Sequence, residues 1–121
     1  MKTATVSLVH PILFVFDFSS QAFSVPEYDP ASAVSANGNG LSIQAVSEVD
    51  GEVTVRLTSA IPSAVGAEAH EVFAGSSSRR VAVVTSENEK LLEADLASTI
   101  AQVRVMVDDS EFPADIWVEA C

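Results

Sequence analysis

The chain has 121 residues, 48% of them hydrophobic, and seventeen acids against six bases give a net charge of −11. A chain of this length can bury a core without disulfides or a structural metal, so we expect one globular domain over 1–121. The single cysteine, Cys121, excludes an internal disulfide and a thiolate zinc cluster. The acidic balance disfavours direct binding to nucleic acid, whose phosphates are contacted by Lys and Arg.

The residue balance favours β-structure. Eighteen valines and five isoleucines stand against seven leucines, and β-branched side chains suit a pleated, half-buried surface better than a helix. We therefore predict a mainly β chain.

The first predicted strands are Thr3–His10 and Ile12–Phe18, where Ile12, Phe14, Phe16 and Phe18 share one face. Pro11 separates them and predicts a bulge or sharp bend, because proline cannot donate to a strand ladder. The stretch that follows, up to Asn39, has little periodicity and is expected to be a long connection.

Two β-hairpins are predicted next. Alternating apolar residues in Leu41–Ala45 and Val53–Leu57 flank an Asp50-Gly51 turn. The strands Glu68–Ala74 and Arg80–Thr85 flank a loop of one glycine and three serines, which predicts a second hairpin with a longer turn.

The segment from Ser86 to Ile100 is ambiguous. Ser86 with Glu89 matches a helix capping box, but Leu92, Ala94 and Leu96 alternate with acids, and we favour a strand. Ala101–Val107 and Asp115–Glu119 complete the pattern. These short segments predict a single-domain antiparallel two-sheet β-sandwich of seven to nine strands, with at most one short helix near 87–100.

The N-terminus resembles a secretory signal only superficially. Lys2 precedes an apolar stretch, but His10 and Pro11 interrupt it and Asp17 follows at once. With no apolar run of the roughly 18 residues that a membrane span needs, we expect a cytoplasmic protein without a membrane partner.

Catalytic patterns are not evident in the sequence. The two histidines, His10 and His70, are about sixty residues apart, and we interpret them as ordinary strand residues. The chain has no His-x-x-x-His, no Gly-x-Ser-x-Gly and no phosphate-binding glycine loop. We expect no enzyme activity, no cofactor and no resident metal. Arg79-Arg80 is interpreted as a solvated turn, and Trp117 as a core aromatic.

Charge is the remaining feature. Residues 1–47 hold three acids and one base, whereas 48–121 hold fourteen acids and five bases. Such a surface attracts basic proteins and speeds their association. We predict that the chain inhibits a basic partner, most specifically a nuclease, through carboxylates on loops and exposed strand faces: Glu48, Asp50, Glu52, Asp108, Asp109 and Glu111. The alternative is a calcium- or ligand-binding sandwich that uses the acidic loop 108–115. The oligomeric state stays open.

The order of segments resembles the competence protein J family, small inhibitors of a bacterial DNA-entry nuclease. The similar stretches are Val6–His10 running into Phe14–Phe16, Leu41–Ala45 leading to Val53–Leu57, and Val83–Asn88. The resemblance implies an immunity-like nuclease inhibitor in the bacterial cytoplasm. It carries over no catalytic or contact residues, and the strand 101–107 lacks the aromatic character expected of the family.

Overall fold

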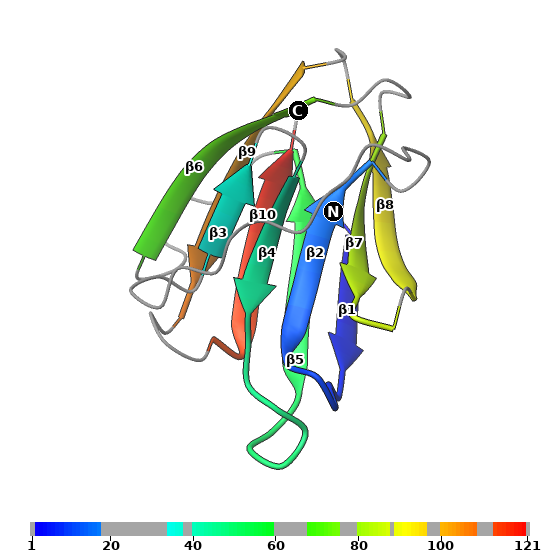
Figure 1. Ribbon diagram of the computed structural model, residues 1–121, viewed down its shortest axis with the longest axis vertical. Helices are drawn as coiled ribbons and strands as arrows, with labels where there is room; N and C mark the ends of the chain where they lie inside the picture. Colours follow the sequence, from blue (N-terminus) through cyan, green and yellow to red (C-terminus); the bar gives the residue numbers. More distant parts are fainter. Residues whose placement is uncertain are drawn as a thin grey trace.

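The computed structural model describes residues 2–17, 34–37, 40–59, 68–75, 80–87, 89–96, 100–108 and 113–120. Within these ranges the chain forms ten β-strands (Figure 1). No helix long and apolar enough to cross a membrane occurs in the described residues. The strands are β1 (Lys2–Val6), β2 (Ile12–Phe16), β3 (Val34–Asn37), β4 (Gly40–Gln44), β5 (Val53–Thr58), β6 (Glu68–Gly75), β7 (Arg80–Thr85), β8 (Lys90–Asp95), β9 (Ile100–Val107) and β10 (Asp115–Ala120).

The strands form two five-stranded sheets packed face to face, which confirms the predicted mainly β, two-sheet sandwich (Figure 1). One sheet, called sheet A, has the order β1-β5-β10-β9-β6, and the other, sheet B, has the order β3-β4-β2-β7-β8. Neighbouring strands are antiparallel except β5 and β10, which are parallel. The strand in excess of the predicted seven to nine is β3, which lies in the stretch predicted to be a connection.

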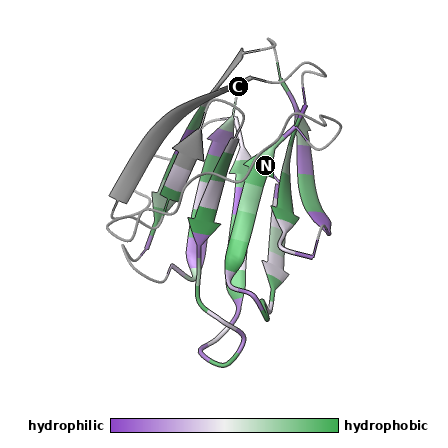
Figure 2. Cartoon of the chain, in the orientation of Figure 1, coloured by the Kyte–Doolittle hydropathy of each residue, from purple (hydrophilic) through white to green (hydrophobic). Residues whose placement is uncertain are grey.

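The core lies between the sheets and is built from alternate residues. In sheet A, β5 contributes Val53, Val55 and Leu57, and β9 contributes its valines in the same alternation. In sheet B, Leu13 and Val15 of β2 are buried against them. Each such side chain contributes about 1.5–3 kcal/mol when fully buried. The period-2 pattern therefore specifies the buried face of β5 and β10, whereas β7 is buried at every position from Val81 to Thr85. β2 is apolar along its whole length (Figure 2), and its buried face is set by packing.

Both predicted hairpins are wrong. β4 lies in sheet B and β5 in sheet A, so the connection 45–52 crosses from one sheet to the other. β6 and β7 likewise lie in different sheets. The local turn at Asp50-Gly51 is present, since the Ser47 carbonyl oxygen accepts hydrogen bonds from the amides of both residues at 3.0 and 3.1 Å. Alternation of apolar and polar residues shows which face of a strand is buried, but it does not show to which sheet the strand belongs. Two strands in opposite sheets that face the same core have the same alternation as two strands paired in a hairpin.

The β1–β2 connection contains the bend predicted at Pro11. β1 ends at Val6, earlier than predicted, and the Ile12 amide donates to the His10 carbonyl oxygen at 2.7 Å in a tight three-residue turn. The chain thereby passes from sheet A to sheet B. The face shared by Ile12, Phe14 and Phe16 is the outer face of sheet B, while the residues between them enter the core.

The segment that was ambiguous between strand and helix is β8, an edge strand paired with β7. The favoured strand interpretation is therefore confirmed over its described part. At the start of β4, Gly40 lies opposite Phe16. A Cβ at Gly40 would be 2.7 Å from the Val15 carbonyl oxygen and 2.9 Å from the Phe16 Cβ, so β2 and β4 approach unusually closely there.

Candidate protein-binding surface

Four connections meet at one end of the sandwich. β1, β4, β7 and β9 end there, and β2, β5, β8 and β10 begin there (Figure 1). The described parts of these connections are residues 7–11, 45–52, 86–87 with 89, and 108 with 113–114. We call this end the acidic end, after the carboxylates of Glu48, Asp50, Glu52, Glu87, Glu89 and Asp108 that it carries.

Backbone hydrogen bonds join three of the four connections. The Ala45 amide donates to the Pro11 carbonyl oxygen at 2.8 Å, and the Glu48 amide donates to that of Leu8 at 2.8 Å. The Val46 amide donates to the Pro113 carbonyl oxygen at 3.2 Å. The backbones of these three connections therefore form one continuous hydrogen-bonded surface.

The structure brings together the acids predicted on two connections. Glu48, Asp50 and Glu52 are exposed on the β4–β5 connection, and Asp108 is exposed at the end of β9, at the same end of the molecule. The predicted residues Asp109 and Glu111 lie outside the described residues.

The carboxylates of the acidic end lack basic partners in the described part of the chain. The ion pairs in the described residues involve other carboxylates: Arg80 pairs with Glu93 and Asp95, Lys90 with Glu93, and Arg56 with Asp115. Of these residues, Lys90 and Asp115 begin β8 and β10 at the acidic end. Arg80 begins β7 at the opposite end. The six carboxylates that define the acidic end therefore have no ion-pair partner among the described residues, and direct pairing does not neutralise the negative potential that they create.

Glu87 and Glu89 were not predicted as site residues, and Glu89 was considered only as part of a helix capping box that the favoured strand interpretation set aside. They belong instead to the tight β7–β8 turn, in which the Thr85 amide donates to the Glu89 carbonyl oxygen at 2.9 Å. The Glu89 amide donates to the Thr85 hydroxyl oxygen at 3.2 Å. The sequence signal that could have identified them is the pair of glutamates, Glu87 and Glu89, in the short connection between two strands.

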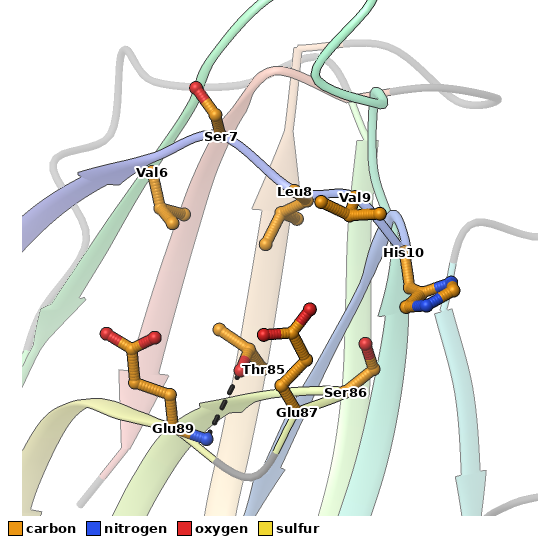
Figure 3. Close-up of a pocket in the computed structure, with 9 residues that line it drawn as sticks. All are labelled: Val6, Ser7, Leu8, Val9, His10, Thr85, Ser86, Glu87 and Glu89. Atoms are coloured by element: carbon orange, nitrogen blue, oxygen red, sulfur yellow. Dashed lines mark hydrogen bonds between the residues drawn. The ribbon is translucent and has the colours of Figure 1, made fainter.

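A cleft of about 90 Å³ separates this turn from the β1–β2 connection (Figure 3). Both glutamate side chains extend from the turn towards the connection that carries Leu8 and Val9. The volume of about 90 Å³ is that open to the centre of a water-sized sphere, of which one water molecule needs roughly 10–15 Å³. The cleft therefore has room for several waters or for the end of a long side chain. Its lining residues are Val6, Ser7, Leu8, Val9, His10, Thr85, Ser86, Glu87 and Glu89.

His10 and Ser86 both line this cleft, so we asked whether they form a nucleophile and base. The His10 ring turns away from the cleft (Figure 3), and no hydrogen bond joins it to Ser86 or to either glutamate among the described residues. The prediction that His10 is a strand residue is wrong, because His10 is exposed in the β1–β2 connection. Nucleophilic catalysis requires the base within hydrogen-bond reach of the nucleophile, and this arrangement does not provide it.

The acidic loop proposed to bind calcium uses its described carboxylates internally. Asp108 Oδ1 accepts hydrogen bonds from the amides of Ala114 and Asp115, both at 3.0 Å. The Asp115 carboxylate forms an ion pair with Arg56. No group of three or more potential metal ligands occurs among the described residues.

Trp117 was predicted to be a core residue, and this prediction is wrong. Its neighbours Ile116 and Val118 are buried, while Trp117 is half-buried on the outer face of sheet A. There the Arg56 guanidinium carbon lies 4.8 Å from the centre of the indole ring, within the range of a cation–π contact. Arg80 pairs with Asp95, and Arg79 and Cys121 lie outside the described residues.

Comparison with known proteins gives a result at the level of the fold. No protein-family model matches the chain, and no curated protein matches its sequence. The structure is similar to the crystal structure of ComJ, inhibitor of the DNA degrading activity of NucA, from Bacillus subtilis. The TM-score is 0.67, and the match covers 99% of this chain and 94% of that chain at 14% identity. The predicted resemblance to competence protein J is thereby confirmed as a shared fold.

Proposed function

We propose that this chain is a non-catalytic protein that binds and inhibits a basic nuclease in the bacterial cytoplasm, and that the acidic end is its contact surface. The observation that supports the proposal is that exposed carboxylates without a basic partner among the described residues come from separate connections at one end of the sandwich. A nuclease groove is positively charged because it binds phosphates. A rigid acidic surface is complementary to such a groove and competes with DNA for it. The shared fold with a nuclease inhibitor supports the same function.

The direct test is a DNA-cleavage assay with the nuclease encoded beside the gene for this chain, and with NucA as a second probe. We expect stoichiometric suppression of cleavage that weakens as salt is raised, because screening shortens the Debye length from about 10 Å at 0.1 M to about 3 Å at 1 M. Undiminished cleavage by both nucleases at a large excess of this protein would refute the proposal.

Charge variants locate the surface. Replacing Glu48, Asp50 and Glu52 by Gln, Asn and Gln removes three negative charges from the acidic end. We expect association with the nuclease to slow by about tenfold at low salt, with a smaller change in dissociation. The matched control removes three charges elsewhere, by Glu93→Gln, Asp95→Asn and Glu119→Gln. If both triple variants slow association equally, net charge matters and the acidic end does not.

A further inference from the structure

The acidic end also carries exposed apolar side chains. In the described part of the chain, the exposed large hydrophobic residues are Val9 at 59%, Ile12 at 37% and Val49 at 88% exposure. All three lie at this end of the sandwich, in or beside the β1–β2 and β4–β5 connections. Single exposed apolar residues scattered over a surface need no explanation. These three residues, however, all lie at the end that carries the carboxylates without basic partners in the described residues, and this restriction does need an explanation.

The two valines lie on connections that are hydrogen-bonded to each other. Val9 follows Leu8 and Val49 follows Glu48, and Leu8 and Glu48 are joined by the 2.8 Å backbone hydrogen bond between the connections. A second hydrogen bond, from Ala45 to Pro11, holds the connections at their other end. Val9 and Val49 therefore lie on two connections that backbone hydrogen bonds hold side by side, and we call this pair of exposed valines the valine ridge. Glu48 and Asp50 flank Val49 in the chain, and the cleft with Glu87 and Glu89 borders Val9.

We propose that the valine ridge is the apolar centre of the interface with the basic partner, and that the surrounding carboxylates form its charged rim. This inference rests on the proposed function and adds the residues that determine the lifetime of the complex. Interfaces generally place a dehydrated apolar centre inside a polar rim. Charges at the rim mainly set the association rate, and buried apolar contacts mainly set the dissociation rate.

The occupant is a positively charged protein and not a second copy of this chain. Two copies meeting through the acidic end would bring unpaired carboxylates of like sign together, which opposes association. A cationic partner neutralises the same carboxylates while it covers the valines. The aliphatic parts of its Lys and Arg side chains suit this mixed surface, because they bury methylenes and keep the charge near the carboxylates.

The experiment measures association and dissociation rates with the nuclease that this protein inhibits in the cleavage assay. The variants are Val9→Ser, Val49→Ser and the double variant. Val49 is almost fully exposed in the free protein, so we expect unchanged melting temperatures. Dissociation should accelerate by about tenfold for each valine, with association changed by less than about threefold. Val9→Ile and Val49→Ile keep the apolar surface and should retain slow dissociation.

The outcomes separate the two proposals. If the unmodified protein neither binds nor inhibits the nuclease, the proposed function and the ridge fail together. If it inhibits, and the charge variants slow association while the double serine variant dissociates at the original rate, the valine ridge is refuted and the proposed function stands. Light scattering of the free protein tests whether the ridge binds a second copy of this chain. If the free protein is a dimer and the serine substitutions dissociate it, the ridge is a dimer interface and the proposal is overturned.

Discussion

Substitution of Gly40 by alanine tests how closely β2 and β4 approach each other. Facing Cβ atoms in antiparallel strands are normally about 4.5–5.5 Å apart, whereas an added Cβ at Gly40 would lie 2.9 Å from that of Phe16. It would also lie 2.7 Å from the Val15 carbonyl oxygen. Neither atom can be moved by a side-chain rotation, because one belongs to the backbone and the other is attached to it. β4 must therefore shift away from β2, which is bonded on both sides in sheet B.

The expected cost follows from these distances. Overpacking of this kind typically costs about 1–3 kcal/mol, and the lower entropy of unfolded alanine offsets roughly 0.4–1 kcal/mol of it. We expect Gly40→Ala to lower the free energy of unfolding by about 1–2 kcal/mol. With a urea m-value of about 1–3 kcal/mol/M, the midpoint should fall by roughly 1 M.

The assay is urea denaturation followed by far-UV circular dichroism. Ser42→Ala, on the same strand, face and partner strand, adds no atoms and serves as the control, expected to change stability by less than about 0.5 kcal/mol. A Gly40→Ala variant as stable as the original protein would show that the strands have room for a Cβ and would refute the reasoning. Because Gly40 lies at the end of the sandwich opposite the acidic end, the substitution should leave the proposed binding surface of the folded variant unchanged.

Further predictions concern the packing around the site. In a double-mutant cycle, Arg56→Ala and Trp117→Ala should show a coupling of about 0.5–1 kcal/mol in unfolding experiments, and additive effects would contradict the cation–π contact. Asp108→Ala leaves two amides without their acceptor and should cost about 1–3 kcal/mol, whereas Asp108→Asn keeps an oxygen there and should cost less; equal losses would contradict this role. Ile43→Val should cost about 0.5–1.5 kcal/mol and Leu41→Ala about 2–5 kcal/mol, as measured by thermal melting. Millimolar calcium should leave the melting temperature unchanged, and a clear rise would favour the alternative of a calcium-binding loop.

The sequence predicts the strands and their buried faces well, for a physical reason. Alternation in β5 and β9 reflects the strand period directly, so the core valines could be named from the pattern. The pairing of the strands could not be predicted from this pattern. In a sandwich, β4 and β5 show the same inward alternation whichever sheet they occupy. A type of turn also does not determine whether the chain returns to the same sheet, as Asp50-Gly51 shows.

The candidate site was predictable only in part. Glu48, Asp50 and Glu52 are close in sequence, so their gathering on one connection follows from local structure. Their location at the same end of the sandwich as the β7–β8 turn does not, because it depends on the packing of two sheets. The exposure of Val9 and Val49 was also hidden, since nothing in a sequence distinguishes a solvent-facing valine in a connection from one at the end of a core strand.

The position of β10 has a consequence for biosynthesis. This strand occupies the middle of sheet A, between β5 and β9, although it is the last of the described strands to leave the ribosome. Until it emerges, the pair β1–β5 and the pair β6–β9 have no common neighbour to join them, so sheet A cannot be completed before residues 115–120 have been synthesised. Removal of residues 115–120 would therefore divide sheet A at its centre and leave β5 and β9 without the strand that joins them.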